Sequence, residues 1–196
     1  METTAPVLAR QPTLRTERLA LRPLVPGDAP AVQALAGDRE VAYNTLHIPH
    51  PYPEDAAAKW IGTLAVAYDC GEAVVFGLAL REGGALVGTC GLTLDLAHAR
   101  GEIGYWVGRP YWGRGLATEA AHATIEYAFT RLGVRRVHAH HYTRNSASGA
   151  VLRKLGMKHE GTLRAHILKW GVFEDIEVYG VLRDEWGSHR DTEAQR

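Results

Sequence analysis

The sequence predicts one α/β (or α+β) domain of three layers, in which helices flank a mixed central β-sheet. The chain has 196 residues, the size of one domain, and 46% of them are hydrophobic, enough for a sizeable core. Hairpin-forming strands come first, and strands alternate with helices later, a pattern typical of this class. The expected domain covers residues 14–186, between a flexible N-terminal lead-in at 1–13 and a polar tail at 187–196.

The first part of this domain contains a strand, two helices and a loop. Residues 18–23 alternate apolar and polar side chains, which is the period of a strand. Asp28 precedes an early proline, so we expect a helix that Asp28 caps and that ends near Gly37. Residues 46–53 hold three prolines and two histidines, which predicts a loop. Apolar residues at helical spacing predict a second helix over 54–68.

Two apolar strands then follow at 73–80 and 85–94, and the intervening Glu82-Gly-Gly predicts a hairpin. The rest of the pattern is a strand, a long helix, a strand, a helix and two strands, at residues 101–107, 115–132, 136–142, 145–155, 158–165 and 173–182. Crossovers of this kind after a hairpin-rich half indicate a mixed sheet with helices on its faces.

Charge and composition argue against several function classes. The 22 Lys and Arg residues balance 22 Asp and Glu, so we expect no broad surface for nucleic acid or membrane. Apolar runs fall far short of the ~20 residues that a membrane-spanning helix needs, and the N-terminus lacks the features of a secretory signal. We therefore expect a cytoplasmic protein. Cys70 and Cys90 suit a reducing compartment, although two cysteines also permit one disulfide.

A glycine-rich turn between a predicted strand and a predicted helix is the sharpest candidate binding motif. It contains, in order, Trp112, Gly113, Arg114, Gly115, Leu116, Ala117 and Thr118. Glycine lets the backbone approach a ligand closely, and the free N–H groups of a helix start favour a phosphate. A plain turn that needs glycine for its dihedral angles is the alternative. The motif lacks the Gly-Lys-Ser/Thr of a Walker loop and the full dinucleotide fingerprint.

This turn resembles the acetyl-CoA pyrophosphate loop of the GNAT N-acetyltransferases, whose pattern is Gln/Arg-x-x-Gly-x-Gly/Ala. Gly115 and Ala117 match its last two fixed positions, and Trp112 stands where Gln or Arg is usual. Further segments resemble the RimJ/RimL-like ribosomal-protein N-acetyltransferases, in the same order, at residues 16–23, 101–107, 145–148, 154–157, 160–164, 171–175 and 185–186. The resemblance covers about residues 14–186.

The resemblance implies a GNAT-like fold with a splayed sheet, and direct attack of an amine on acetyl-CoA in a ternary complex. It implies cofactor contacts from Tyr105, Trp106, Val107, Trp112, Gly113, Arg114, Gly115, Leu116, Ala117, Thr118, Asn145 and Ser148. The implied acceptor is a protein N-terminal amine, such as that of a ribosomal protein. A small-molecule amine, such as a polyamine or an aminoglycoside, is the alternative, and a non-catalytic acyl-CoA-binding module is a third. Either a monomer or a homodimer is compatible with this interpretation.

Glu102 is the first candidate for the catalytic base. Burial in a cleft raises the pKa of a carboxylate, which suits proton removal near neutral pH, through water. A surface glutamate paired with Arg100 is the alternative. The family's usual tyrosine acid corresponds here to Leu152, so Ser148 is the candidate donor to the leaving thiolate. Asn145 is expected to cap its helix.

Three histidines, His138, His140 and His141, invite a metal interpretation. On a strand, His138 and His140 share one face and His141 points to the other. Two histidines on one face lack the further ligands of a zinc site, so we expect no metal. His138 or His140 is an alternative base. We expect acceptor recognition from the irregular segments 46–52 and 165–173.

Overall fold

The computed structural model describes residues 10–186, and residues 1–9 and 187–196 of the predicted lead-in and tail lie outside them. The strands are β1 (Leu14–Arg15), β2 (Leu19–Pro23), β3 (Ala73–Leu80), β4 (Leu86–Asp95), β5 (Arg100–Val107), β6 (Arg136–Tyr142), β7 (Lys158–Lys169) and β8 (Val172–Leu182). The helices are α1 (Ala29–Ala36), α2 (Arg39–Asn44), α3 (Ala56–Asp69), α4 (Leu116–Arg131) and α5 (Ser146–Lys154). Within the predicted lead-in, the side chain of Gln11 donates a hydrogen bond to the carbonyl of Val75 at 2.8 Å.

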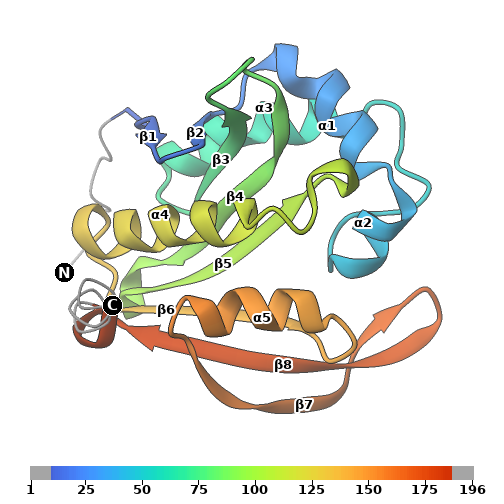
Figure 1. Cartoon of the computed structure of the whole chain (residues 1–196). Helices are drawn as coiled ribbons and strands as arrows, with labels where there is room; N and C mark the ends of the chain where they lie inside the picture. Colours follow the sequence, from blue (N-terminus) through green and yellow to red (C-terminus); the bar gives the residue numbers. More distant parts are fainter. Residues whose placement is uncertain (1–9, 187–196) are drawn as a thin grey trace.

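The strands form one sheet in the order β1-β2-β3-β4-β5-β6-β8-β7 (Figure 1). Neighbouring strands are antiparallel except β5 and β6, which run parallel, so the predicted mixed sheet is confirmed. Only Arg100–Glu102 of β5 pairs with Arg136–His138 of β6. Beyond Glu102 the two strands diverge, which is the splay that the resemblance implied.

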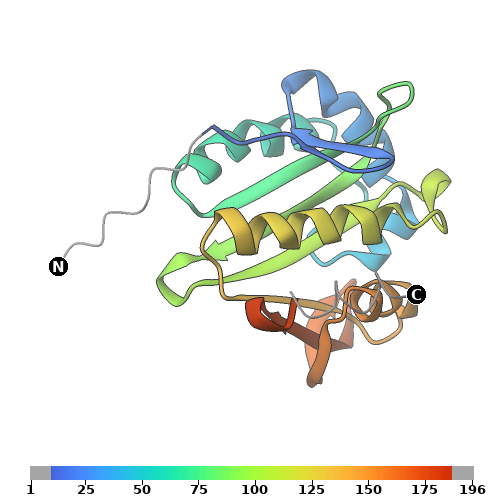
Figure 2. The ribbon, with the colours of Figure 1, turned by 60° about the vertical axis from the view of Figure 1, so that its left-hand side comes forward.

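Helices cover both faces of the sheet (Figure 2). The main core lies under α4, whose Ala121, Ile125 and Ala128 recur at the three- and four-residue spacing of one helix face and are fully buried. A smaller core lies under α1 and α3, around Val32 and Ile61. Residues of β4 and β5 pack in these cores on the two faces of the sheet.

The N-terminal part departs from its prediction in two respects. The sequence pattern missed β1 and α2, because each is too short to show a period. Asp28 occupies the predicted N-cap position of α1, but its side chain makes no capping hydrogen bond. Its carboxylate accepts two hydrogen bonds of 2.7 Å from Arg22 and one of 2.8 Å from the Val25 backbone, and none from its helix. A charged, bidentate partner outcompetes the cap.

The irregular connection predicted for 165–173 is also wrong. Strand β7 continues to Lys169 and β8 begins at Val172, so only Trp170 and Gly171 form the turn, with φ of 50° and 83°. The pairing of β7 with β8 shifts register between Leu163 and Ile167. This irregularity interrupts the alternation of side chains and hides the long hairpin from sequence reasoning.

Candidate functional site

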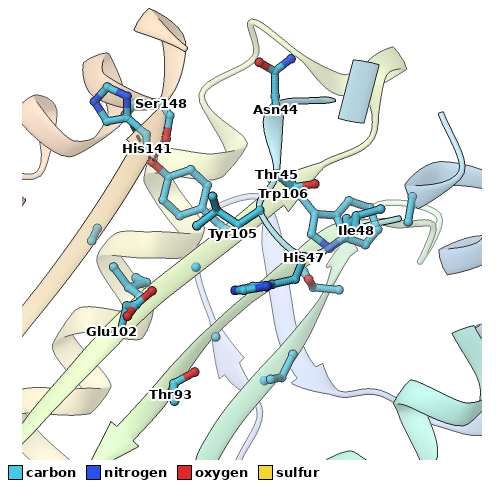
Figure 3. Close-up of a pocket in the computed structure, with 18 of the residues that line it drawn as sticks. Asn44, Thr45, His47, Ile48, Thr93, Glu102, Tyr105, Trp106, His141 and Ser148 are labelled. Carbon is cyan, nitrogen blue, oxygen red and sulfur yellow. Dashed lines mark hydrogen bonds between the residues drawn. The ribbon is translucent and has the colours of Figure 1, made fainter. Parts of the chain in front are cut away.

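The divergence of β5 from β6 is accompanied by two adjoining cavities. One, here named the helix cavity, has about 400 Å³ and lies between the end of β5, the first turn of α4 and one side of α5. The other, the sheet cavity, has about 490 Å³ and lies over β3–β6, under α1, α3 and the loop after α2 (Figure 3). The two cavities share the lining residues Asn44, Thr45, Tyr105, Trp106 and Ser148. A ligand in one cavity therefore meets a ligand in the other at this junction.

The helix cavity gathers nearly all of the residues that the resemblance implied for cofactor contacts. Its lining includes Tyr105, Trp106, Val107, Trp112, Gly113, Gly115, Leu116, Ala117, Thr118, Asn145 and Ser148. The indole of Trp112 donates a 2.5 Å hydrogen bond to the carbonyl of Val107, which ties the turn to β5. Arg114 does not line this cavity, and its guanidinium lies 5.8 Å from the ring centroid of Tyr111.

The backbone conformation of the turn between β5 and α4 requires glycine at two positions. Gly113 and Gly115 both have φ of +74°, and Gly115 is the residue that caps α4. L-residues rarely adopt this left-handed conformation. The first N–H groups of α4, at Leu116, Ala117 and Thr118, have no acceptor within the helix. Together with the positive end of the helix dipole, they form a cradle that fits a pyrophosphate.

Glu119 ties this turn to the N-terminal part of the sheet. Its Oε1 accepts hydrogen bonds from Thr16 Oγ1 at 2.6 Å and from the Arg18 backbone N–H at 2.8 Å. Its Oε2 accepts from Arg18 Nε at 2.7 Å, and Arg18 Nη1 donates to the Arg114 carbonyl at 2.7 Å. Arg18 therefore offsets the one acidic charge in the first turn of α4 and also fixes the turn itself.

Tyr105 and Ser148 meet at the junction of the two cavities. Tyr105 Oη lies 3.0 Å from Ser148 Oγ, although the residues are 43 positions apart (Figure 3). Burial raises the pKa of Tyr105, so its hydroxyl keeps its proton. Asn145 Oδ1 accepts the Ser148 backbone N–H at 3.1 Å, which confirms the predicted helix cap. Sequence reasoning missed this use of the Tyr105 hydroxyl, because no local pattern links β5 with α5.

Glu102 lies in the sheet cavity between two histidines. Its carboxylate oxygens are 3.5 Å from His138 Nε2 and 3.2 Å from His140 Nδ1. The hydrogen bond with His138 is the main cause that lowers the pKa of Glu102, and together with smaller electrostatic effects of His140, His138 and His47 it outweighs the opposing effect of burial. The predicted rise of this pKa is therefore wrong. Arg100 is not its partner, since the Arg100 guanidinium pairs with Asp95 at 2.9 Å.

The three histidines of β6 lie on the two faces of the sheet. His138 and His140 share the face that carries Glu102, whereas His141 is buried and stacks on the Tyr179 ring at 5.6 Å between centroids. Burial lowers the pKa of His140, which favours its neutral form near pH 7. Within residues 10–186, no three His, Cys, Asp or Glu side chains are grouped so that they could hold a metal ion.

Both cysteines in the chain are free thiols, Cys70 exposed and Cys90 buried. Burial raises the pKa of Cys90 to about 12, so this thiol is not available as a nucleophile near neutral pH. In the described part of the chain, none of the helices combines the length and the apolar character needed to cross a membrane.

The two segments expected to recognise the acceptor lie together. Leu46, His47, Ile48, Pro49 and Tyr52 line the sheet cavity, whereas no residue of 165–173 lines either cavity. The β7–β8 hairpin instead contacts the loop after α2 through hydrogen bonds. Buried Lys169 donates hydrogen bonds to the carbonyls of Thr45, at 2.8 Å, and Ile48, at 3.2 Å. The ring of Trp170 packs 5.8 Å from that of His50.

The sequence of the chain is similar to those of known acetyltransferases. The family described as "Acetyltransferase (GNAT) domain" matches residues 18–158. The Bacillus subtilis protein "Uncharacterized N-acetyltransferase YoaA" is 32% identical over 173 residues, covering 88% of this chain and 97% of that protein. The ribosomal protein uS5-alanine N-acetyltransferase of Escherichia coli is 27% identical over 140 residues, covering 70% of this chain and 71% of that protein.

A solved structure of RimL, a ribosomal L7/L12 alpha-N-protein acetyltransferase in complex with coenzyme A, superposes with a TM-score of 0.81. It is 18% identical and covers 87% of this chain and 98% of that one, which shows a shared fold.

Proposed function

The chain belongs to the GNAT acetyltransferase family, and from this premise we propose that it transfers the acetyl group of acetyl-CoA to the N-terminal amine of a protein. The observation that carries the proposal is the junction of the two cavities. The helix cavity ends there at Tyr105 and Ser148, and the sheet cavity leads from the same residues to Glu102. A cofactor and an acceptor amine held in the two cavities meet where proton donors and acceptors are present.

The helix cavity fits the cofactor. Gly113 and Gly115 shape the turn, and the N–H groups of Leu116, Ala117 and Thr118 would hold the pyrophosphate. Bound acetyl-CoA supplies an acetyl thioester, an activated acyl donor. In the transfer, the amine nitrogen forms a bond to the acetyl carbon and the carbon–sulfur bond breaks. The amine loses a proton and the departing thiolate gains one.

The residues of the sheet cavity suit the first of these proton movements. Glu102 is ionised in the neutral range because its pKa is lowered, and His140 is neutral because burial lowers its own pKa. Each can therefore accept a proton. An α-amino group has a pKa of about 8, so part of it is already deprotonated near neutral pH and a weak base suffices. Ser148 and Tyr105 are the donors to the departing sulfur.

The charge of the sheet cavity favours an acceptor with a single amine. Glu102 is the one carboxylate among its lining residues, and two histidines already contact it. A polyamine or an aminoglycoside carries several positive charges and calls for several carboxylates. A protein N-terminus carries a single positive charge, and the relative from Escherichia coli is named as an alanine N-acetyltransferase of ribosomal protein uS5. A monoamine of low molecular weight is the second candidate, because the rest of the lining is largely apolar.

Two measurements test the proposal. Acetyl-CoA should raise the melting temperature, since a ligand that binds only the folded state stabilises it. Thiol release should then be measured with peptides, polyamines and aminoglycosides as acceptors, and we expect turnover with peptides. Turnover of polyamines alone would contradict the acceptor class, and stabilisation without thiol release would support a binding module. The two free thiols are compatible with the cytoplasmic location that this proposal includes.

A further inference from the structure

The sheet cavity has a floor that lacks side chains at its centre. Gly91 of β4 and Gly104 of β5 are cross-strand partners. Along the same face, the next pair in one direction is Thr93 with Glu102, and Trp106 lies in the other direction. Successive positions on one face of a strand are about 7 Å apart. On this face of the sheet, glycine backbone therefore stands between Glu102 and Trp106, and His47 of the loop after α2 lines the same cavity (Figure 3).

The two glycines are present for different reasons. A Cβ added to Gly91 would lie 2.6 Å from the Val74 carbonyl oxygen, so this position cannot carry a side chain. A Cβ added to Gly104 would have no heavy atom within 4 Å, and its φ lies outside the left-handed region. Neither packing nor backbone conformation requires glycine at position 104. Its effect is to keep the floor of the sheet cavity empty.

Apolar groups line much of the space above this floor. Val75 continues the floor on β3, opposite Gly91. Ile48, Tyr52 and Trp60 line the cavity from the loop and from α3. Because Lys169 holds the loop at the carbonyl of Ile48, this side is fixed in place. The apolar part of the cavity thus begins next to the Glu102 carboxylate.

We propose that the sheet cavity selects primary amines that carry a bulky apolar group a few bonds from the nitrogen. The amine lies toward Glu102, and the apolar group lies over Gly104 and against Ile48 and Trp60. This inference rests on the proposed acetyl transfer and names the acceptor chemistry more closely. Two sources supply this chemistry, a polypeptide with a large apolar first residue and a free arylalkylamine.

The test uses acceptor pairs that differ only in the apolar group. One pair is a peptide that begins with Phe and the same peptide beginning with Gly, and the other is phenylethylamine and ethylamine. Since even one methylene in an apolar pocket changes kcat/KM about tenfold, we expect at least about a tenfold preference for the bulky member. Comparison of kcat/KM for the Phe peptide with that for phenylethylamine then identifies the source as a polypeptide or a free amine.

Gly104→Leu should fill the floor. We expect it to lower kcat/KM for the bulky acceptor about tenfold and to change that for the small acceptor less than about threefold. The matched control is Gly62→Leu, since Gly62 is exposed on α3 and a Cβ there also has no heavy atom within 4 Å. The control should keep the wild-type preference, and unchanged stabilisation by acetyl-CoA shows that Gly104→Leu is folded.

Equal or faster turnover of the small acceptors overturns the proposal, and so does an equal effect of Gly104→Leu on both members of a pair. Absence of thiol release with every amine contradicts the proposed function instead. In that case calorimetry with the CoA-bound protein decides the further inference. Tighter binding of phenylethylamine than of ethylamine, lost in Gly104→Leu, supports the apolar subsite, and equal binding overturns it.

Discussion

Glu102 Oε1 lies 3.2 Å from His140 Nδ1, at the point where β5 stops pairing with β6. The last parallel pair joins Glu102 with His138, whose Nε2 is 3.5 Å from Glu102 Oε2. The carboxylate thus bridges two histidines where the strands begin to diverge. Above this point each strand has one edge without a strand partner, and the cavities occupy the space. The divergence that opens the site also places its titratable groups together.

We predict that Glu102→Gln lowers kcat/KM roughly 10- to 100-fold near neutral pH and leaves the Kd for acetyl-CoA unchanged, since a general base contributes at least this much. The carboxylate charge raises the pKa of His140 against the larger, lowering effect of burial. Removing that charge should lower the His140 pKa further. The acidic limb of the pH–rate profile should therefore move to lower pH.

Stopped assays of thiol release between about pH 5 and 9 would measure this limb, and equilibrium binding would measure the cofactor affinity. An unchanged rate in Glu102→Gln would show that the base lies elsewhere, and His140→Asn and His138→Asn would then identify it. A shift of the acidic limb to higher pH would contradict the electrostatic coupling of Glu102 with His140.

Ser148 and Tyr105 should act as one proton-donating unit, because their hydroxyl oxygens are 3.0 Å apart at the cavity junction. We predict that Ser148→Ala and Tyr105→Phe each lower kcat about tenfold or more, and that the double variant loses little beyond the larger single effect. Single-turnover rates at saturating acetyl-CoA would measure these effects. Multiplicative losses would mean that the two hydroxyls act independently.

Arg18 should support cofactor binding without lining the helix cavity. It contacts Glu119 and the Arg114 carbonyl at 2.7 Å, so Arg18→Met should loosen the glycine turn and raise the Kd for CoA several-fold. Arg81→Met is a matched control, because Arg81 donates to the carbonyls of Thr16 and Glu17 in the same segment and does not contact the turn. Calorimetry on both variants measures the difference, and equal losses would show a general effect on the segment.

The parts of this site that sequence reasoning predicted are local in the chain. The glycine turn is a continuous segment in which backbone conformation and helix start are encoded side by side. The shared face of His138 and His140 follows from the two-residue period of a strand. Tyr105 and Ser148 are 43 positions apart, and only the parallel crossover brings them together. Their contact has no signal in a single sequence.

Tertiary contacts also explain the predictions that were wrong. The pKa of Glu102 is lowered because His138 and His140 contact it, and the predicted rise considered burial alone. Asp28 pairs with Arg22, a residue six positions away on another element, instead of capping its own helix. In each case a side chain from another element overrides the local rule, an imidazole for Glu102 and a guanidinium for Asp28.

Lys169 should act as a positioning residue for the acceptor loop. Its ammonium group is buried and donates to the carbonyls of Thr45 and Ile48, which border the sheet cavity. In Lys169→Met these carbonyls lose their donor, which costs about 1–3 kcal/mol for buried groups. If about 1 kcal/mol of this cost destabilises the loop conformation that lines the sheet cavity, the KM for the acceptor rises roughly fivefold. The Kd for acetyl-CoA should change less than the acceptor KM, because Thr45 is the one of these two loop residues that also lines the helix cavity.

Steady-state kinetics with the acceptor varied at saturating acetyl-CoA would measure this change in KM. Lys169→Arg should recover part of the acceptor affinity, because a guanidinium can donate to both carbonyls. Lys59→Met is the control for loss of a lysine charge, since the Lys59 side chain is 75% exposed on α3. A loss of melting temperature with no change in the acceptor KM would make Lys169 purely structural. An equal rise in KM for Lys59→Met would assign the effect to charge and not to the loop.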